Sequence, residues 1–173
     1  MWDVVEVDGE LRLSSVAYRE VWLPRQEATA RCRRPLAALP WARMPLHEPP
    51  NAACRCGIHA VRSPVAAAAH LRREAPGRSA GVARVMGTVA LWGRVVEADA
   101  GWRGGLAYPT ALLVPTGRWG RIASAALWPY RPSPGDIARH LEAYGVPVDV
   151  AVLDGSLDAA SGAVPSLAGT TLV

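Results

Sequence analysis

The chain has 173 residues, of which 19 are basic and 15 acidic, so its formal net charge is +4 at pH 7. Half of the residues are hydrophobic, which is enough for a compact core and too many for an intrinsically disordered chain. The longest uncharged stretches, residues 104–117 and 159–173, contain proline and glycine and are shorter than a membrane span of about 20 residues. Because the first residues contain no basic region followed by an apolar segment, we expect a cytoplasmic protein without a membrane partner.

The charge is unevenly distributed. All basic residues are arginine, and the bias toward Ala, Arg, Gly, Pro and Val is typical of a GC-rich genome. Residues 12–84 hold thirteen arginines and four acidic residues, whereas residues 140–173 hold four acidic residues and no arginine. Such asymmetry favours an anion-binding face on the first half of the chain.

The first third of the chain predicts short strands followed by an irregular loop. Residues 2–7 and 11–16 alternate in hydropathy around Asp8-Gly9, which predicts a β-hairpin with a tight turn. A short strand is predicted at 21–23, closed by Pro24. Residues 33–51 contain five prolines and little periodicity, so regular structure is not expected there. A loop of this length inside a compact domain needs something to hold it.

The remaining residues predict two helices and a glycine-rich sheet. Both helices begin with Ser-Pro, at Ser63 and Ser133, and both are followed by Gly or Pro signals. Asp136 stands where a capping-box partner of Ser133 is expected. The elements expected, in chain order, are a helix at 63–77, a strand bent at glycines at 81–97, a turn at 98–105, returning strands at 106–108 and 111–114, a helix at 133–145 and an edge strand at 146–153.

These elements predict an α+β fold. We expect a strongly bent antiparallel sheet or a small, partly open barrel, with two short helices and a metal-stapled loop. Residues 1–153 are expected to form a single domain with a metal-binding loop at 32–56. Residues 154–173 are rich in Gly, Ser, Ala and Thr and are expected to form a loosely ordered tail.

The three cysteines and one histidine suggest a metal site. Cys32 begins the proline-rich loop, His47 lies within it, and Cys54 and Cys56 end it. Three thiolates and an imidazole are a ligand set that closes a tetrahedral zinc site, and Gly57 permits the sharp backbone that two nearby sulfurs need. Other interpretations are buried small cysteines, a redox or nucleophilic thiol, and an iron–sulfur cluster. His59 competes with His47 as the fourth ligand.

The run Cys54-Arg55-Cys56-Gly57-Ile58-His59-Ala60, with the run from Gly87 to Glu97 after it, resembles a set of uncharacterised bacterial proteins. That set has a Cys-x-Cys-Gly-Ile-Tyr-Ala core, a His-x-Pro shortly before it and a Gly-x-Val-x-Leu-Trp-Gly strand after it. The resemblance covers residues 20–115 and implies no activity. It implies that His47, in His47-Glu48-Pro49, is the ligand, because the position of His59 is usually tyrosine in that set.

No strong catalytic motif accompanies these residues. The sequence contains no Gly-x-Gly-x-x-Gly, no lysine for a phosphate-binding loop and no His-Glu-x-x-His. The leading hypothesis is therefore a non-catalytic, zinc-stabilised binding or adaptor module for a protein or an anionic ligand. One alternative is a cysteine-dependent enzyme, or a redox or iron–sulfur protein, that uses Cys54 or Cys56.

A second alternative is single-stranded nucleic-acid binding. Its candidate residues are four arginines that would track phosphates, interleaved with Trp22 and Trp41, on which bases would stack. The arginines are Arg31, Arg33, Arg34 and Arg43.

Overall fold

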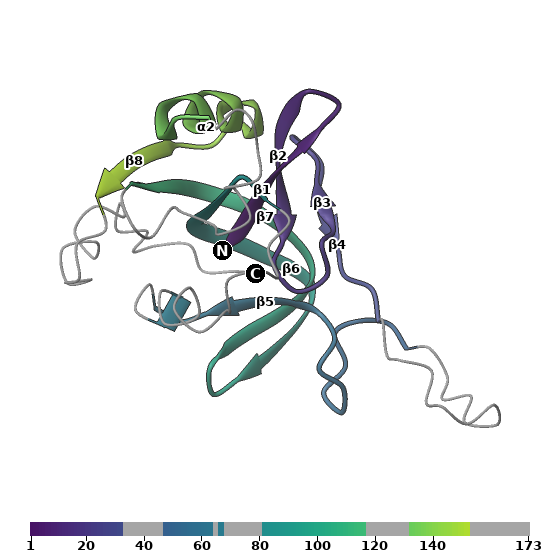
Figure 1. Cartoon of the computed structure of the whole chain (residues 1–173). Coiled ribbons are helices and arrows are strands. Elements are labelled where there is room, and N and C mark those ends of the chain that lie inside the picture. Colours follow the sequence, from purple (N-terminus) through teal and green to yellow (C-terminus); the bar gives the residue numbers. More distant parts are fainter. Residues whose placement is uncertain (33–46, 64–65, 68–80, 117–131, 153–173) are drawn as a thin grey trace. The chain divides into compact units, whose positions relative to one another are not determined.

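A computed structural model describes residues 1–32, 47–63, 66–67, 81–116 and 132–152 (Figure 1). Within these residues the chain is mostly sheet, with one short α-helix and one turn of 3-10 helix. None of the helices described is long and apolar enough to cross a membrane. The elements are β1 (Trp2–Val7), β2 (Glu10–Ser15), β3 (Val21–Trp22), β4 (Ala28–Thr29), β5 (Ile58–Val61), β6 (Ala83–Ala98), β7 (Gly101–Thr116), α2 (Pro134–Leu141), η2 (Glu142–Tyr144) and β8 (Val148–Val152).

The strands form a mixed sheet that is not closed. Its order is β3-β2-β1-β6-β7-β4, and β5 and β8 also pair with β7. Strand β8 runs parallel to β7, whereas β4 and β5 are antiparallel to it. The prediction of a purely antiparallel sheet is therefore wrong at β8, because the chain reaches this strand through α2 and not through a hairpin.

The chain divides into two compact units. The first contains residues 1–26, 63–88 and 109–173, and the second contains residues 27–62 and 89–108. Strands β6 and β7 contribute residues to both.

The first unit opens with the predicted β1–β2 hairpin. Trp2 pairs with Ser15 and Val7 with Glu10, and Asp8 and Gly9 have φ angles of 53° and 79°. These positive φ angles fit a tight hairpin turn, which asparagine, aspartate and glycine tolerate best. The other edge of β1 pairs with β6, from Trp2 opposite Val85 to Val4 opposite Ala83. The sequence prediction of the hairpin is confirmed.

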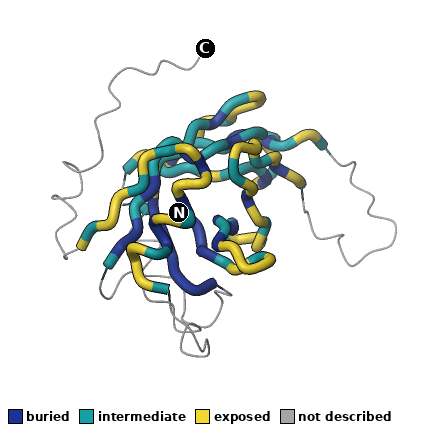
Figure 2. The backbone as a smooth tube through the Cα atoms, turned by 90° about the horizontal axis from the view of Figure 1, so that it is seen from above, coloured by how far each residue is buried: buried dark blue, intermediate teal, exposed yellow. Residues whose placement is uncertain are grey.

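The core of the first unit lies along β1, β2, β6 and β7. Gly81 to Met86 are buried without interruption, and in Figure 2 the buried stretches appear in dark blue beside exposed stretches in yellow. Trp2 and Trp22 pack edge to face with ring centroids 5.4 Å apart. Both indoles are at most 5% exposed, so they contribute apolar area to the core.

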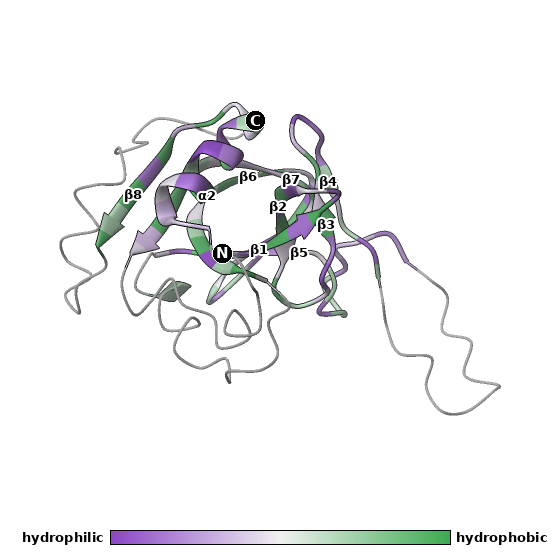
Figure 3. Ribbon diagram, turned by 45° about the horizontal axis from the view of Figure 1, so that its top comes forward, coloured by the Kyte–Doolittle hydropathy of each residue, from purple (hydrophilic) through white to green (hydrophobic). Residues whose placement is uncertain are grey.

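Helix α2 covers part of this core. Ser133 Oγ accepts a hydrogen bond from the Asp136 amide, and Asp136 Oδ2 accepts one from the Ser133 amide, which completes the predicted capping box. Ile137 and Leu141 are buried, and the helix packs against β2 and β8 (Figure 1). Figure 3 shows hydrophobic residues on β8, and two of them, Val150 and Val152, are 45% and 65% exposed.

Tyr144 fastens the segment after α2 to the sheet. Its ring is 2% exposed, and its hydroxyl accepts a hydrogen bond from the Leu13 amide at 2.9 Å. The same hydroxyl donates to the Trp22 carbonyl at 2.5 Å. One phenol group therefore bridges the backbones of β2 and β3. Both strands precede Tyr144 by more than a hundred residues in the sequence.

A buried ion pair joins β1 and β6. Arg84 Nε donates to Asp3 Oδ1 at 2.7 Å, and both side chains are 8% exposed. The two residues are directly opposite in the strand register. Removing either partner would leave the other charge buried without its counterion, which is strongly destabilising. A shifted register of β1 against β6 would separate the two charges and is disfavoured for the same reason.

The second unit is built on the other part of the long β6–β7 pair. Strand β5 pairs with β7 from Ile58 opposite Gly104 to Val61 opposite Gly101. Strand β4 pairs with β7 through Thr29 opposite Leu106, and the Ala30 amide donates to the Gly105 carbonyl at 2.7 Å. The chain therefore leaves the edge of β7 after Ala30 and returns to the same edge at Ile58, only one β7 residue further along.

Two predictions for the middle of the chain need revision, and a third agrees with the structure. The turn predicted at 98–105 is much shorter, because β6 continues to Ala98 and β7 starts at Gly101. The returning strand is continuous and is not divided at Pro109. Gly93 has a φ of 69° within β6, which agrees with the predicted bend at a glycine.

Of the helix predicted at 63–77, the structure describes only the start. Residues 66–67 are helical, and Ser63 Oγ accepts a hydrogen bond from the Ala66 amide at 3.2 Å, as expected of an N-cap. The rest of this prediction lies outside the described residues, as does the predicted tail at 154–173.

We expect Tyr144→Phe to destabilise the protein. The substitution keeps the buried ring but leaves the Leu13 amide and the Trp22 carbonyl without the hydroxyl that bridges them, at about 1–3 kcal/mol for each unsatisfied group. Urea denaturation measures the change in the free energy of unfolding. Tyr18→Phe, at a side chain that is 50% exposed, is the control and should change it by less than about 0.5 kcal/mol. Equal effects of the two substitutions would contradict the bridging role.

Candidate metal centre

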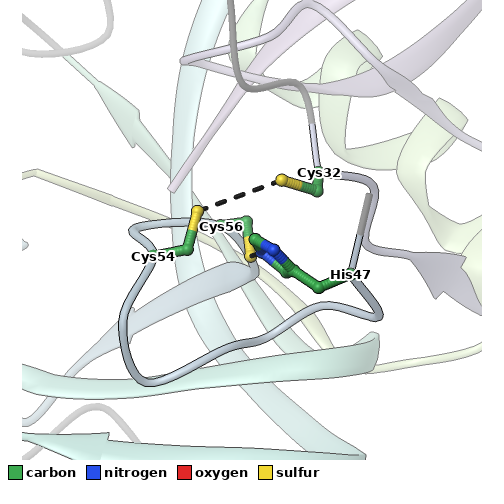
Figure 4. A group of neighbouring side chains, drawn as sticks. All are labelled: Cys32, His47, Cys54 and Cys56. Atoms are coloured by element: carbon green, nitrogen blue, oxygen red, sulfur yellow. Dashed lines mark hydrogen bonds between the residues drawn. The ribbon is translucent and has the colours of Figure 1, made fainter. Parts of the chain in front are cut away.

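Cys32, His47, Cys54 and Cys56 lie together in the second unit. Each offers one ligand atom, and these four atoms all lie within 4.8 Å of one another. Figure 4 shows the four side chains pointing toward a common centre from three separate parts of the loop. They sit close enough to hold a metal ion.

The measured separations agree with a single tetrahedral ion. Cys32 Sγ lies 3.9 Å from Cys54 Sγ, and His47 Nε2 lies 3.2 Å from Cys56 Sγ. With Zn–S bonds of about 2.3 Å and a Zn–N bond of about 2.0 Å, tetrahedral geometry places two sulfurs about 3.8 Å apart and a sulfur and a nitrogen about 3.5 Å apart. Small side-chain adjustments would therefore complete the site.

The strand pairing explains why these residues meet. Cys32 follows the last β4 contact by two residues, and Cys56 precedes the first β5 contact by two residues. Because Ala30 and Ile58 pair with neighbouring residues of β7, the two ends of the loop from 31 to 57 lie close together, and we call this region the base of the loop. Cysteines at both ends of such a loop are brought together by the backbone alone.

Gly57 makes the sharp change of direction after Cys56. Its φ is 119°, and a Cβ atom there would lie 3.0 Å from Pro50 Cβ and 3.1 Å from Arg103 Cβ. Both the backbone conformation and the lack of space therefore require glycine. This agrees with the prediction that Gly57 lets Cys54 and Cys56 face one centre.

Arg103 holds the backbone of the loop that carries Cys54 and Cys56 through hydrogen bonds. Its Nη1 donates to the carbonyl oxygens of Asn51 at 3.3 Å and Cys56 at 3.2 Å, and it forms a third, shorter hydrogen bond to the Cys54 carbonyl. One guanidinium group therefore holds the backbone of both cysteines in the Cys54-Arg55-Cys56 segment. The sequence predicts a turn at 98–105, but Arg103 lies within β7 and opposite His59 of β5.

The glycines around Arg103 were the signal for this role. Gly104 and Gly105 suggested a turn, yet both are strand residues at which other atoms approach closely. A Cβ atom at Gly105 would lie 3.0 Å from the Pro49 carbonyl oxygen, within the ligand-bearing loop. Glycine here permits the loop to pack on the strand.

The four candidate ligands differ in exposure. Cys56 is 6% exposed, whereas Cys32, His47 and Cys54 are half-buried. Burial has the largest influence on the Cys56 thiol and raises its pKa; the Asn51 backbone hydrogen bond, next in size, lowers the pKa, and the neighbouring Cys54 and Cys32 thiols raise it. A divalent cation at the centre would favour the thiolate forms instead, because it places positive charge beside all three sulfurs.

The remaining candidate residues do not join the cluster. His59 is exposed and its Nε2 donates to the Arg55 carbonyl at 3.0 Å, so of the two histidines the structure brings only His47 to the cysteines. Arg31 is exposed next to Cys32, whereas Arg33, Arg34 and Arg43 lie outside the described residues. Trp22, expected as a stacking platform, is 5% exposed and packs on Trp2.

No protein-family profile, curated protein sequence or solved structure matches the chain.

We expect Arg103→Met to lower the affinity for a divalent metal about 10- to 100-fold, the usual effect of losing a group that orients ligands from outside the coordination shell. The three carbonyl groups would lose their common donor, and the cysteines their fixed backbone. Competition with a chromophoric chelator measures the affinity. Arg94→Met, at an exposed residue of β6 in the same unit, is the matched control and should leave it unchanged. If Arg103→Met also leaves the metal affinity unchanged, the Arg103 guanidinium is not needed to position the cysteines.

Proposed function

We propose that this chain is a non-catalytic binding module whose second unit is stabilised by a zinc ion held by Cys32, His47, Cys54 and Cys56. The observation that carries the proposal is the convergence of these four ligand atoms within 4.8 Å. Three thiolates and one imidazole form a closed coordination shell, which is typical of structural zinc sites. Catalytic zinc sites have three protein ligands and keep one position for water or substrate.

Among the described residues, the second unit buries few large apolar side chains. Its buried apolar residues are Ala30, Pro50, Cys56, Leu91 and Ala107, of which only Leu91 and Pro50 are larger than alanine or cysteine. Small folds without a large apolar core commonly depend on a metal or a disulfide. The free energy of metal binding would therefore be folding free energy for this unit.

We propose zinc and not an iron–sulfur cluster because the distances between the candidate ligand atoms fit a single metal ion. The Cys32–Cys54 and His47–Cys56 distances of 3.9 and 3.2 Å match a single centre. Iron–sulfur clusters contain several metal ions and are most often held by four thiolates. Iron is nevertheless accepted by the same ligand types, so the elemental composition decides.

A cysteine-dependent enzyme is the main competitor. The 3.2 Å approach of His47 Nε2 to Cys56 Sγ resembles a nucleophile and its base. However, Cys56 is buried, and its pKa is raised by that burial, whereas reactive thiols are partly exposed and have lowered pKa values. These two properties favour a ligand over a nucleophile.

A protein is the proposed partner because of the apolar surface at β3. Tyr18, Val21 and Leu23 are 50%, 37% and 45% exposed and lie within six residues of one another. Strand β3 stands at one end of the strand order, and edge strands with exposed apolar side chains can accept a partner's strand. This surface belongs to the first unit, whereas the proposed role of the metal is to keep the second unit folded.

The metal assignment is tested by comparing two histidine variants. We expect His47→Ala to reduce bound zinc from about one ion per chain to a small fraction, and His59→Ala to retain it, because only His47 faces the sulfurs. Elemental analysis of freshly purified protein measures the zinc, and an absorption spectrum shows whether iron is present instead.

The same measurements on wild-type protein test the metal assignment even if a variant does not fold. Metal-free wild-type protein whose thiols alkylate freely in the folded state would overturn the metal assignment and favour reactive cysteine chemistry. Loss of zinc from His59→Ala and not from His47→Ala would reverse the choice of ligand.

The stabilising role is tested by removing the metal. We expect a strong chelator to increase amide hydrogen exchange at β4 and β5, which flank the ligand-bearing loop, while β1 and β2 stay protected. The reason is that, among the described residues, the first unit buries many large apolar side chains, whereas the second buries few. Mass spectrometry of peptides covering each strand measures the exchange. Unchanged exchange at β4 and β5 after complete metal removal would show that the ion does not hold the second unit.

A further inference from the structure

We propose that Cys32 and Cys54 are a modification site at which peroxide forms a disulfide and expels the metal ion. The release of metal rests on the proposed function, whereas the formation of the disulfide depends only on the two sulfurs. The proposal gives the site a response to oxidants in addition to its role in stability.

The geometry selects this pair of cysteines. Cys32 Sγ and Cys54 Sγ are 3.9 Å apart, so they must approach by roughly 2 Å to reach the S–S bond length of about 2.05 Å. Figure 4 shows these two sulfurs facing each other, while Cys56 lies beside His47. Both residues lie at the base of the same loop, which the β4 and β5 pairings hold closed before any bond forms.

Exposure selects the same pair. Cys32 and Cys54 are half-buried, whereas Cys56 is 6% exposed. Oxidation of cysteine follows thiolate character and access of the oxidant. In the metal-bound state all three sulfurs are thiolates, so access decides which of them react.

The reaction needs only hydrogen peroxide. One thiolate attacks a peroxide oxygen, the O–O bond breaks, and the leaving hydroxide takes up a proton, which yields a sulfenic acid and water. The second thiolate attacks the sulfenic sulfur, the S–S bond forms, and the S–O bond breaks to release a second hydroxide, which is also protonated. In total, two thiolates are oxidised by two electrons and one peroxide is reduced to two waters.

The disulfide would change what holds the loop. A disulfide sulfur is no longer an anionic ligand, so His47 and Cys56 would remain alone, and two ligands do not close a zinc site. The base of the loop would stay closed because the new bond joins Cys32 to Cys54. The segment carrying His47 would lose its attachment to the metal.

The test is peroxide treatment of the metal-loaded full chain, followed by two independent measurements. We expect the release of about one zinc ion per disulfide formed, read with a chromophoric chelator, and a Cys32–Cys54 linkage in peptide mass mapping. A linkage between Cys54 and Cys56, oxidation without any linkage, or a disulfide formed with the zinc retained would overturn the proposal.

Two variants separate this proposal from the metal assignment. Cys56→Ser, which removes a ligand but neither partner of the disulfide, should still form the Cys32–Cys54 linkage, whereas Cys32→Ser should not. If purified wild-type protein holds no metal, the proposed function fails, and mapping of the linkage in the same sample still decides whether the disulfide forms. Should the variants not fold, the linkage map of wild-type protein alone supports or overturns the pairing.

Discussion

The hydrogen-bonded edge of β7 is the constraint on which the candidate metal centre depends. Residues 101–107 of this strand hold β5 and β4 one after the other along the same edge. The long loop between them therefore starts and ends at neighbouring points, and most of the entropy of closing it is lost to backbone pairing before any metal binds. Cysteines placed two residues from each end are close together as a result. The ion would need to fix side chains, not to gather distant parts of the chain.

The cluster of Cys32, His47, Cys54 and Cys56 was predictable from the sequence because cysteine and histidine are the residue types that bind zinc. Cysteine and histidine are uncommon in this chain, and their position around a proline-rich loop indicated what holds that loop. Local signals also predicted the β1–β2 hairpin and the Ser133 capping box, since a turn dipeptide and a cap act within a few residues. Residues 33–46, the middle of that loop, lie outside the described residues, so its predicted lack of regular structure stays a prediction.

The features that the sequence did not predict depend on contacts between distant segments. Strand β4 has two residues and no pattern of its own, and it exists because β7 accepts it. Arg103 was assigned to a turn because Gly104 and Gly105 are typical turn residues, yet these glycines permit close packing of a loop on a strand. The parallel pairing of β8 depends on where α2 packs, and a hydropathy pattern does not encode that direction.

The two units illustrate different ways of stabilising a fold. The first buries large side chains, such as Trp2, Leu13, Leu141 and Tyr144, and also a charged pair that specifies how β1 meets β6. The second buries mainly small residues among those described, and its loop is held by backbone pairing and by one arginine that donates to three carbonyl groups; the proposed metal would add coordination by the sulfur and imidazole groups. Apolar burial is insensitive to metal supply and to oxidants, whereas thiolate coordination responds to both. In the proposed function, loss of the metal or oxidation of the thiols would therefore change the state of the second unit while the first unit stays folded, because the two units would be stabilised by different chemistry.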